Sequence, residues 1–339
     1  MKKSRTTITE IAKELGVSPS TVSRALNNHP AISNKTRDAI VKLALKLDYQ
    51  PNLLALNLLR KKTNTIGVIV PEITSYFFSS VISGIQDLLH PIGVNMIIGQ
   101  SNESYEEERS IVQTFASIRV DGFLISPSSE TKNFDHLKKL TNNNIPLVIF
   151  DRDCDGIEVD KVFVDEYRGA FQAVEYLIQT GCKKIAHIAG QQTLSTARYR
   201  LKAYKDALEK YNLPINDEYI VKSKGFFPKH GIKPTKRLLS LPNPPDAIFT
   251  INDGVAIGAM YVVKDFGIKI PEEISIIGFD DDPHSSYFKP SLSTVWQPTY
   301  EMGMLSARLL INRINSSNDL SNIRVETLLP ELVVRGSSL

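Results

Sequence analysis

Two hydrophobic patterns divide this chain of 339 residues. Up to about residue 50, apolar residues recur with the 3.6-residue period of amphipathic helices. From Thr65 onward, short continuous apolar runs such as TIGVIVP and IPLVIFD alternate with amphipathic stretches. Continuous apolar runs are typical of parallel strands that are buried on both faces. The sequence therefore predicts a small helical unit followed by an α/β unit.

The first helix is expected to begin near Ile8, because Thr7 and Glu10 have the spacing of a capping box. Its apolar stripe ends at Gly16, a residue suited to leaving a helix. Ser18 can then act as the N-cap of a second short helix with its own apolar face. Two short helices joined by a tight turn form a helix-turn-helix, whose second helix lies in the DNA major groove.

The polar face of the second helix separates this pattern from an ordinary helical hairpin. It offers three hydroxyls and one guanidinium and no carboxylate, from Ser20, Thr21, Ser23 and Arg24. Short hydroxyls can bond phosphates, and a long planar donor can reach guanine O6 and N7. This face therefore favours DNA binding.

A third helix is expected from Ser33 or Asn34 to Asp48–Gln50, because Pro51 disfavours helical geometry in the residue before it. The leucine-rich segment LLALNLLRKK, Leu53–Lys62, follows where a linker would normally be polar. A helix this short is not stable alone in water. We expect its leucines to be covered by a second copy of the chain, by an opened base step in DNA, or by both. Packing on its own domain is the alternative.

Charge is distributed unevenly along the chain. Met1 to Lys62 contains twelve Lys or Arg and four Asp or Glu, a net +8, which leaves −5 for the remainder of a chain whose total is +3. A basic head on a mildly acidic body is typical of a nucleic-acid-binding module fused to another domain. With only Cys154 and Cys182 and no apolar run of membrane-spanning length, we expect a soluble cytoplasmic protein without a disulfide framework and without a membrane partner.

The second part of the chain repeats a strand-helix rhythm in two series, with the strand VFVD opening the second series. Helices are expected at residues 77–90, 105–117, 134–142, 167–180, 197–211, 229–239, 254–266 and 301–314. Two consecutive series imply two parallel-sheet subdomains with helices on both faces. Because ligands bind outside the carboxyl ends of parallel strands, two facing sheets would form a cleft.

The expected carboxyl ends of three of these strands carry carboxylates, an amide and a guanidinium. The residues are Asp151, Arg152, Asn252, Asp253, Asp280, Asp281 and Asp282. Two further guanidiniums, Arg198 and Arg200, lie at the start of a helix. Such groups suit polyols, because each hydroxyl both donates and accepts. Asp281 and Asp282 capping a loop, and Arg198 pairing with a surface acid, are the structural alternatives. His187 lies in an apolar strand and is expected in the core.

Catalysis and cofactor binding are not expected. A glycosidase also needs two carboxylates, but these acids are spread over three strand ends without a local motif. The chain has no G-x-G-x-x-G after a strand and no G-x-x-x-x-G-K-[ST], so a nucleotide cofactor finds no support. We therefore expect a protein that is not an enzyme, with no catalytic residue, no cofactor and no metal.

The stretches TITEIAKELGVSPSTVSRALNN and YQPNLLALNLLRKKTNTIGVIVP resemble the N-terminal signature of the LacI/GalR family of bacterial transcription regulators, and the similarity extends through the whole chain. The resemblance implies base-reading positions at Pro19, Ser20 and Arg24. It implies phosphate contacts at Thr7, Thr21, Ser23 and Asn27, and DNA contacts in the hinge at Asn52, Ala55 and Leu58. Leu58 matches a leucine that wedges into the central base step of a palindromic operator. Leu56 stands where many relatives have arginine, so one phosphate contact is not expected here.

The same resemblance implies a body similar to periplasmic sugar-binding proteins. The matching effector positions are Phe77, Asp151, Arg200, Phe227, Asn252, Asp280 and Gln297, in motifs such as TIND, GFDD and ARYRLKAY. The two phenylalanines would cover the C–H face of a sugar ring. Arg152 is added as an effector contact from the strand-end pattern. Together with Arg198, it keeps a sugar acid open beside a neutral sugar.

The predicted fold class is α/β: an N-terminal helix-turn-helix headpiece followed by a periplasmic-binding-protein-like core of two parallel-sheet subdomains. We expect the headpiece at residues 1–51, a hinge helix at 52–62 and an effector-binding and dimerisation core at 63–339. The N-subdomain would contain about 63–161 and 296–322, and the C-subdomain about 162–295 and 323–339. These segments follow from the resemblance.

The predicted function is that of a homodimeric repressor of carbohydrate utilisation genes, bound to a palindromic double-stranded DNA operator and released by a sugar or sugar-derivative effector. A corepressor- or phosphoprotein-dependent global regulator of carbon metabolism is the main alternative. A stand-alone sugar-binding protein or an enzyme is a less favoured alternative, because neither needs a basic headpiece.

Overall fold

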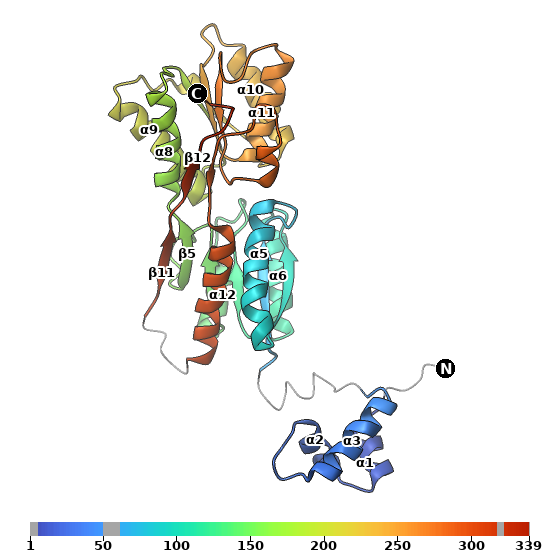
Figure 1. Ribbon diagram of the computed structural model, residues 1–339. Coiled ribbons are helices and arrows are strands. Elements are labelled where there is room, and N and C mark those ends of the chain that lie inside the picture. The colour runs from blue at the N-terminus through green and yellow to red at the C-terminus, as the bar shows by residue number, and fades with distance from the viewer. Residues whose placement is uncertain (1–5, 50–61, 317–321, 339) are drawn as a thin grey trace. The chain divides into compact units, whose positions relative to one another are not determined.

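The computed structural model describes residues 6–49, 62–316 and 322–338 (Figure 1). Met1–Thr63 and Asn64–Leu339 are two separate compact units, one helical and one α/β. The predicted hinge positions Asn52, Ala55 and Leu58 lie outside the described residues. Among the residues that are described, no helix is both long and apolar enough to cross a membrane.

Residues 6–49 of the helical unit form three helices, α1 (Ile8–Leu15), α2 (Pro19–Leu26) and α3 (Asn34–Lys46). The capping box of α1 is confirmed, since the Glu10 N–H donates to Thr7 Oγ1 and the Thr7 N–H donates to the Glu10 carboxylate at 2.7 Å. Gly16 ends α1 with a left-handed φ of 64°. The three helices share a small apolar core made of Ile11, Ala12, Val22, Ala25, Ile40 and Ala44.

The third helix ends earlier than predicted, at Lys46 rather than at Asp48–Gln50. Asp48 adopts a left-handed φ of 48°, and the Tyr49 N–H donates to the Ala44 carbonyl. The helix is therefore closed by a left-handed residue that satisfies its last carbonyls. The restriction imposed by Pro51 acts further along the chain and is not what ends it.

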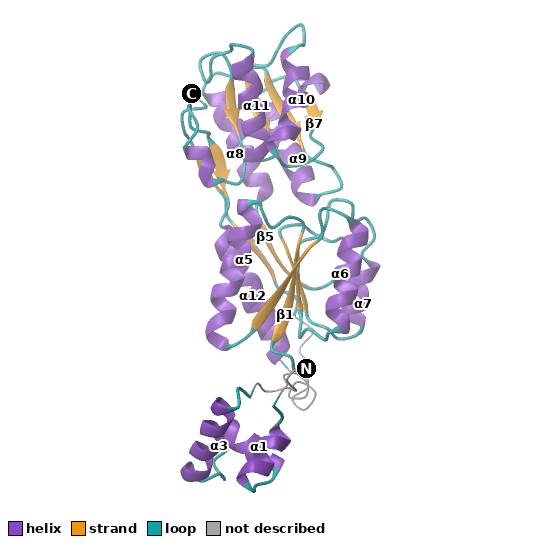
Figure 2. Ribbon diagram, turned by 90° about the vertical axis from the view of Figure 1, so that its right-hand side faces the viewer, coloured by secondary structure: helices purple, strands orange, loops and turns teal. Residues whose placement is uncertain are grey.

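The α/β unit begins with a six-stranded, entirely parallel sheet in the order β11-β5-β4-β3-β1-β2. Its strands are β1 (Thr65–Val70), β2 (Asn95–Gln100), β3 (Phe123–Ile125), β4 (Leu147–Phe150), β5 (Asp160–Val164) and β11 (Val325–Leu328). Helices cover both faces (Figure 2). One face carries α5 (Tyr76–Leu89) and α12 (Thr299–Asn315), and the other carries α6 (Tyr105–Ser117) and α7 (Asp135–Asn142).

A second, four-stranded parallel sheet follows in the order β7-β6-β8-β9. Its strands are β6 (Ile185–Ala189), β7 (Ile220–Lys222), β8 (Ala247–Thr250) and β9 (Ser275–Ile277). The apolar cores on its two faces include α8 (Glu166–Gln179) and α9 (Ser195–Lys210) on one side and α10 (Pro228–Leu239) and α11 (Asp253–Asp265) on the other. A short antiparallel pair, β10 (Thr294–Trp296) and β12 (Glu331–Val333), and the 3-10 turns His90–Ile92, Asp217–Tyr219 and Pro283–Ser286 complete the unit.

The segments that pass between the two sheets differ from the prediction. The VFVD strand was expected to open the second subdomain, but β5 pairs with β4 in the first sheet. Residues 323–328 were also assigned to the C-subdomain, whereas β11 pairs with β5. The alternation of strands and helices in the sequence is the same whether the next strand joins the preceding sheet or begins a new one, so it could not assign these strands to a sheet. The chain passes between the sheets near Asp165, Gln297–Pro298 and Leu329–Pro330.

Helices α10 and α11 come into close backbone contact at Gly258 of α11. A Cβ at Gly258 would lie 2.0 Å from the Pro228 carbonyl oxygen. Gly258→Ala is therefore expected to force the helices apart and to lower the free energy of unfolding by about 1 to 3 kcal/mol. Urea denaturation of the full chain measures this change, and an unchanged midpoint and slope would contradict the close-packing account.

Candidate functional site

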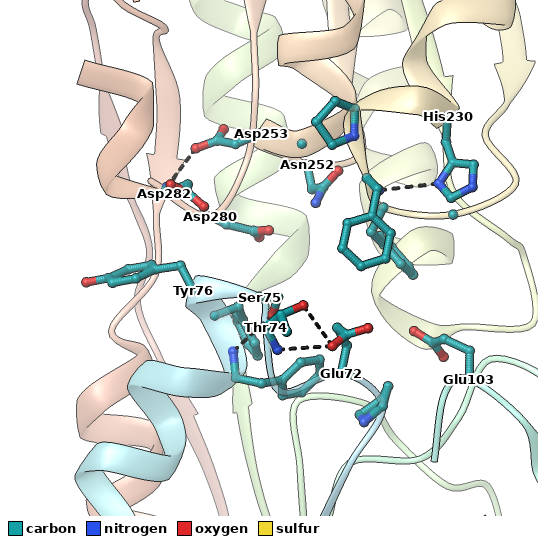
Figure 3. A pocket seen from close by; sticks show the side chains of 18 of the residues that line it. Glu72, Thr74, Ser75, Tyr76, Glu103, His230, Asn252, Asp253, Asp280 and Asp282 are labelled. Atoms are coloured by element: carbon teal, nitrogen blue, oxygen red, sulfur yellow. Dashed lines mark hydrogen bonds between the residues drawn. The ribbon is translucent and has the colours of Figure 1, made fainter. Parts of the chain in front are cut away.

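A pocket of about 580 Å³ opens where the carboxyl ends of the two sheets face each other. The six-stranded sheet contributes residues that follow β1, β2 and β4, and the four-stranded sheet contributes residues that follow β6, β7, β8 and β9. Figure 3 shows these side chains converging from both sides. Seven of the eight predicted effector positions line it, namely Phe77, Asp151, Arg152, Arg200, Phe227, Asn252 and Asp280.

Gln297 is the predicted effector position that does not line the pocket. Its side chain is 2% exposed, and its Nε2 donates to Asp280 Oδ1 at 2.8 Å. Gln297 therefore contacts the carboxylate that lines the pocket. The family resemblance implied an effector contact at Gln297 but could not indicate that its side chain would contact Asp280 instead of lining the pocket.

Asp151 and Arg152 follow β4 and are both nearly buried. Asp151 accepts a hydrogen bond from the Ser126 hydroxyl at 3.0 Å, and burial raises its pKa to about 6 against the opposing charge of Arg152. Arg152 is held by Glu103, whose two carboxylate oxygens lie 2.7 and 2.8 Å from the Arg152 Nη atoms.

Arg200 lies near the start of α9 with a side chain that is 6% exposed. Its Nε donates to Glu166 at 2.7 Å, its Nη1 donates to the Ile251 carbonyl, and its guanidinium lies 3.6 Å from the centre of the Phe279 ring. Asp280 Oδ1 lies 4.0 Å from Arg200 Nη2. Burial raises the pKa of Asp280 well above its ordinary value, and the charge of Arg200 opposes that rise.

The backbone around Asp280 is unusual. Asp280 and Asp281 have φ values of 112° and 53°, in the left-handed region that disfavours side chains with a Cβ. Asp281 forms an ion pair with Arg335 at 2.7 Å and does not line the pocket. Asp281 is thus held by an ion pair within the protein and not by the expected loop cap, which Asp282 forms by accepting from the His284 N–H at 2.8 Å.

Asn252 and Asp253 begin α11. Asn252 caps the helix by accepting from the Val255 N–H at 3.1 Å, and its side chain lies at the pocket wall in Figure 3. Asp253 is 1% exposed and accepts from the Thr294 and Ser285 hydroxyls and the Asp282 N–H at 2.6 to 2.8 Å. Asp253 therefore ties the loop of Asp280 to the start of α11 and to β10.

Burial raises the pKa of Asp253 to about 7, although three hydrogen bonds to its carboxylate lower it. A carboxyl whose pKa is higher in the folded protein binds protons more tightly there, so its contribution to stability is present at low pH and lost as the pH rises through 7. We expect the stability of the wild type relative to Asp253→Asn to fall by about 2 to 4 kcal/mol between pH 4 and pH 8. Urea denaturation of both proteins across this range measures the difference, and a flat difference would contradict the raised pKa.

Aromatic rings cover the remaining pocket wall. Phe77 and Phe78 at the start of α5 pack edge to face, with ring centres 5.0 Å apart. Phe227 caps α10 from the other sheet and is 41% exposed, and its N–H donates to His230 Nδ1 at 3.3 Å. The predicted apolar platforms are thus both present at the pocket.

Sequence reasoning missed several residues that line the pocket, including Glu72, Thr74, Glu103, Lys224, His230 and Phe226. Most lie in loops after β1, β2 and β7, where no motif marked them. Arg198 does not line the pocket; it donates to the Thr193 carbonyl at 3.0 Å and pairs with the exposed Asp155 at 3.9 Å, which is the surface-acid alternative. His187 is fully buried in β6, as expected, and burial lowers its pKa to about 4.

The residues predicted to contact DNA are gathered on α2, apart from Thr7 and the hinge positions. Pro19, Ser20, Arg24 and Asn27 are exposed, and Thr21 and Ser23 are half-buried. The hydroxyl of Ser18 hydrogen-bonds those of Ser20 and Thr21, both at 2.8 Å. Within the helical unit as described, no hydrogen bond or ion pair engages the Arg24 guanidinium.

Family models match both units. The model of bacterial regulatory proteins of the lacI family matches residues 7–52, and the model of a periplasmic binding protein-like domain matches residues 174–338. The first match covers the three helices of the headpiece, and the second covers the four-stranded sheet and its crossing segments.

Three relatives illustrate the similarity over nearly the full length. A probable HTH-type transcriptional repressor ExuR of Bacillus subtilis is 36% identical over 98% of each chain. Catabolite control protein A of Priestia megaterium is 32% identical over 94% of this chain and 95% of its own. A solved complex of the transcriptional regulator CelR with cellobiose is 28% identical, covers 98% of this chain and 100% of its own, and has a TM-score of 0.75.

The ExuR and CelR relatives are named as a transcriptional repressor and a transcriptional regulator. A helix-turn-helix unit and a two-sheet unit with a pocket between its strand ends are the parts that such regulators combine. The chain is therefore a DNA-binding transcription regulator of the LacI family, with a periplasmic-binding-protein-like effector unit.

Proposed function

We propose that this chain is a repressor of carbohydrate utilisation genes, and that a sugar or sugar derivative bound in the pocket releases it from its operator. The observation that carries this proposal is the composition of the pocket. Carboxylates and an amide at the strand ends of both sheets, the guanidiniums of Arg152 and Arg200, and aromatic rings line one cavity. Polar groups that orient hydroxyls, together with rings that cover C–H faces, suit a sugar.

Operator recognition is assigned to the exposed face of α2. Arg24 would read guanine, Pro19 and Ser20 would lie against neighbouring bases, and the hydroxyl side chains and Asn27 would contact phosphates. The hinge residues Asn52, Ala55 and Leu58 are proposed to complete the contact, with Leu58 entering the minor groove. We propose a homodimer on a palindromic operator, acting in the cytoplasm where its DNA is located.

The proposed coupling runs through the segments that join the two sheets. An effector that contacts Asp151 from one sheet and Asp280 from the other favours the arrangement in which both contacts form. A change in the angle between the sheets would alter the spacing of the two hinge segments in a dimer. A coupling of about 1 to 3 kcal/mol between effector and operator is sufficient to change occupancy.

A thermal-shift screen of sugars, sugar acids and nucleosides on the full chain tests the proposal. A ligand at 100 times its Kd adds about 2.7 kcal/mol to the stability of the protein. We expect at least one polyol to stabilise the protein and to weaken its binding to an operator fragment. Stabilisation without any change in operator binding would reject the regulatory proposal.

The similarity to catabolite control protein A supports a second candidate, a global regulator whose operator affinity rises with a corepressor or a phosphoprotein partner. The same assay distinguishes the two. A ligand or partner protein that strengthens operator binding would favour the global regulator, and a ligand that weakens it favours the proposed repressor.

A further inference from the structure

The fork of the Arg152 guanidinium, one of the two guanidiniums that line the pocket, is already occupied by a carboxylate of the protein. Glu103 occupies its fork with both oxygens, and the Pro127 carbonyl accepts from Nη1 at 2.9 Å. The side chain is 7% exposed and lies between the Phe78 and Phe226 rings, with ring centres 5.8 and 5.5 Å from its guanidinium carbon. A ligand carboxylate would bind Arg152 through the same two parallel hydrogen bonds that Glu103 already accepts, so Glu103 occupies the position that this ligand would need.

The second guanidinium is committed in the same way. Arg200 donates to Glu166, which is 5% exposed, and to the Ile251 carbonyl, and its nearest pocket carboxylate is Asp280. Two guanidiniums therefore meet four carboxyl groups, Glu103, Asp151, Glu166 and Asp280, so the acidic groups outnumber the guanidiniums. An anionic ligand in this part of the pocket would lie near carboxylates, and both buried guanidiniums are already paired with acidic side chains of the protein. Its binding would therefore be disfavoured.

Glu103 is held in place by contacts that do not depend on a ligand. Its Oε2 also accepts from the Ser129 N–H at 2.7 Å, and its pKa lies below the ordinary value, because the charge and hydrogen bonds of Arg152 outweigh the effect of burial. Glu103 lies in the loop between β2 and α6, where Asn102 and Glu103 have left-handed φ values of 51° and 61°. The carboxylate is thus ionised and positioned before a ligand arrives.

We propose that Glu103 determines effector specificity: by occupying the fork of Arg152, it makes the pocket select uncharged polyols over sugar acids. This inference rests on the proposed effector function of the pocket. It also removes the reason for keeping a sugar acid open beside a neutral sugar, which was the presence of Arg152 and Arg198 near the cleft. Arg152 is neutralised by Glu103, and Arg198 does not line the pocket.

Lys224 is the remaining cation of the pocket wall, and it is exposed. An exposed ammonium is hydrated and screened by salt, so its attraction for an anion is small. A sugar acid that did bind through Lys224 would lose its affinity in Lys224→Gln and would be indifferent to Glu103. Substitutions of Lys224 and of Glu103 therefore distinguish the two ways in which a sugar acid could bind.

The test compares matched ligand pairs that differ in one carboxylate: glucose and glucuronate, galactose and galacturonate, ribose and ribonate, and cellobiose and cellobionate. Dissociation constants are measured by calorimetry on the full chain at pH 7.5 and one stated salt concentration. In the wild type we expect the neutral member of the best-binding pair to bind at least tenfold more tightly. In Glu103→Gln, which keeps an acceptor for the Ser129 N–H, we expect that ratio to move at least tenfold toward the acid.

Glu72→Gln is the matched control, because it removes the same charge from the pocket wall without releasing a guanidinium. The Glu72 carboxylate accepts from the Thr74 N–H and hydroxyl at 3.0 and 2.8 Å. We expect it to change the ratio by no more than about threefold, as a general charge effect. Equal changes in both variants would overturn the role of Glu103.

Other outcomes are equally decisive. A wild-type preference for the acid member overturns the inference and leaves the proposed effector function standing. Failure of every pair to bind overturns the proposed function and this inference with it. If Glu103→Gln does not fold, as judged by its thermal transition, Glu103→Asp serves instead, since a shorter carboxylate would withdraw from the fork and should shift the ratio in the same direction.

Discussion

Replacing Asp280 with alanine is expected to lower effector affinity at least 100-fold and to leave the operator affinity of the ligand-free protein within about threefold. Asp280 lines the pocket, and only one of its oxygens is engaged, by Gln297 at 2.8 Å. Leaving a buried hydrogen-bonding group without its partner costs about 1 to 3 kcal/mol, so the loss of two hydrogen bonds between Asp280 and the effector accounts for a factor of about 100 or more. The DNA-binding helices belong to the other unit, which the substitution does not touch.

Fluorescence anisotropy of a labelled operator fragment, titrated with an effector found by the thermal-shift screen, measures both quantities on one sample. Asp155→Ala is the matched control, because the Asp155 side chain is 86% exposed and its carboxylate lies outside the pocket lining. An Asp280 variant that still responded to effector as the wild type does would remove Asp280 from the binding site.

The second large effect is expected at Arg24. Its side chain is exposed on α2, and the helix around it is fixed by the Ser18 cap and by the buried Val22 and Ala25. A bidentate arginine–guanine contact is worth about 1 to 3 kcal/mol of discrimination against the wrong base. A dimer on a palindrome would lose this contact twice, so Arg24→Ala should weaken specific operator binding by one to four orders of magnitude.

Nonspecific binding separates base reading from simple charge loss. Arg24→Ala removes one positive charge per chain, which lowers nonspecific affinity only modestly at a fixed salt concentration. Lys13→Ala is a suitable control, because Lys13 is an exposed cation on α1 rather than on α2. A loss that is the same on specific and nonspecific DNA would contradict the role of Arg24 in reading bases.

Local signals explain why the headpiece could be predicted well. The capping box at Thr7, the left-handed Gly16 and the Ser18 cap with Pro19 in the first helical turn all depend on residues within a few positions of each other. The end of α3 was missed because the left-handed Asp48 carries no strong signal in the sequence. The strand ends that carry Asp151, Asn252 and Asp280 were also predictable, since each follows a continuous apolar run.

Long-range pairing accounts for what could not be predicted. Glu103 is 49 positions from Arg152 in the chain, and Glu166 is 34 positions from Arg200. A sequence shows which side chains are charged but not which of them neutralise each other. For the same reason, β5 was assigned to the wrong sheet. Gln297 was likewise predicted in the pocket, whereas it contacts Asp280.

In the proposed mechanism, the pocket and the operator-binding helices are coupled. The most direct test is the operator affinity of the full-length wild type at increasing effector concentration, paired with the effector affinity measured with and without saturating operator. We expect saturating effector to weaken operator binding by a factor of about 5 to 150, and operator to weaken effector binding by the same factor. An operator affinity that stays constant while effector saturates the pocket would contradict a ligand-gated repressor.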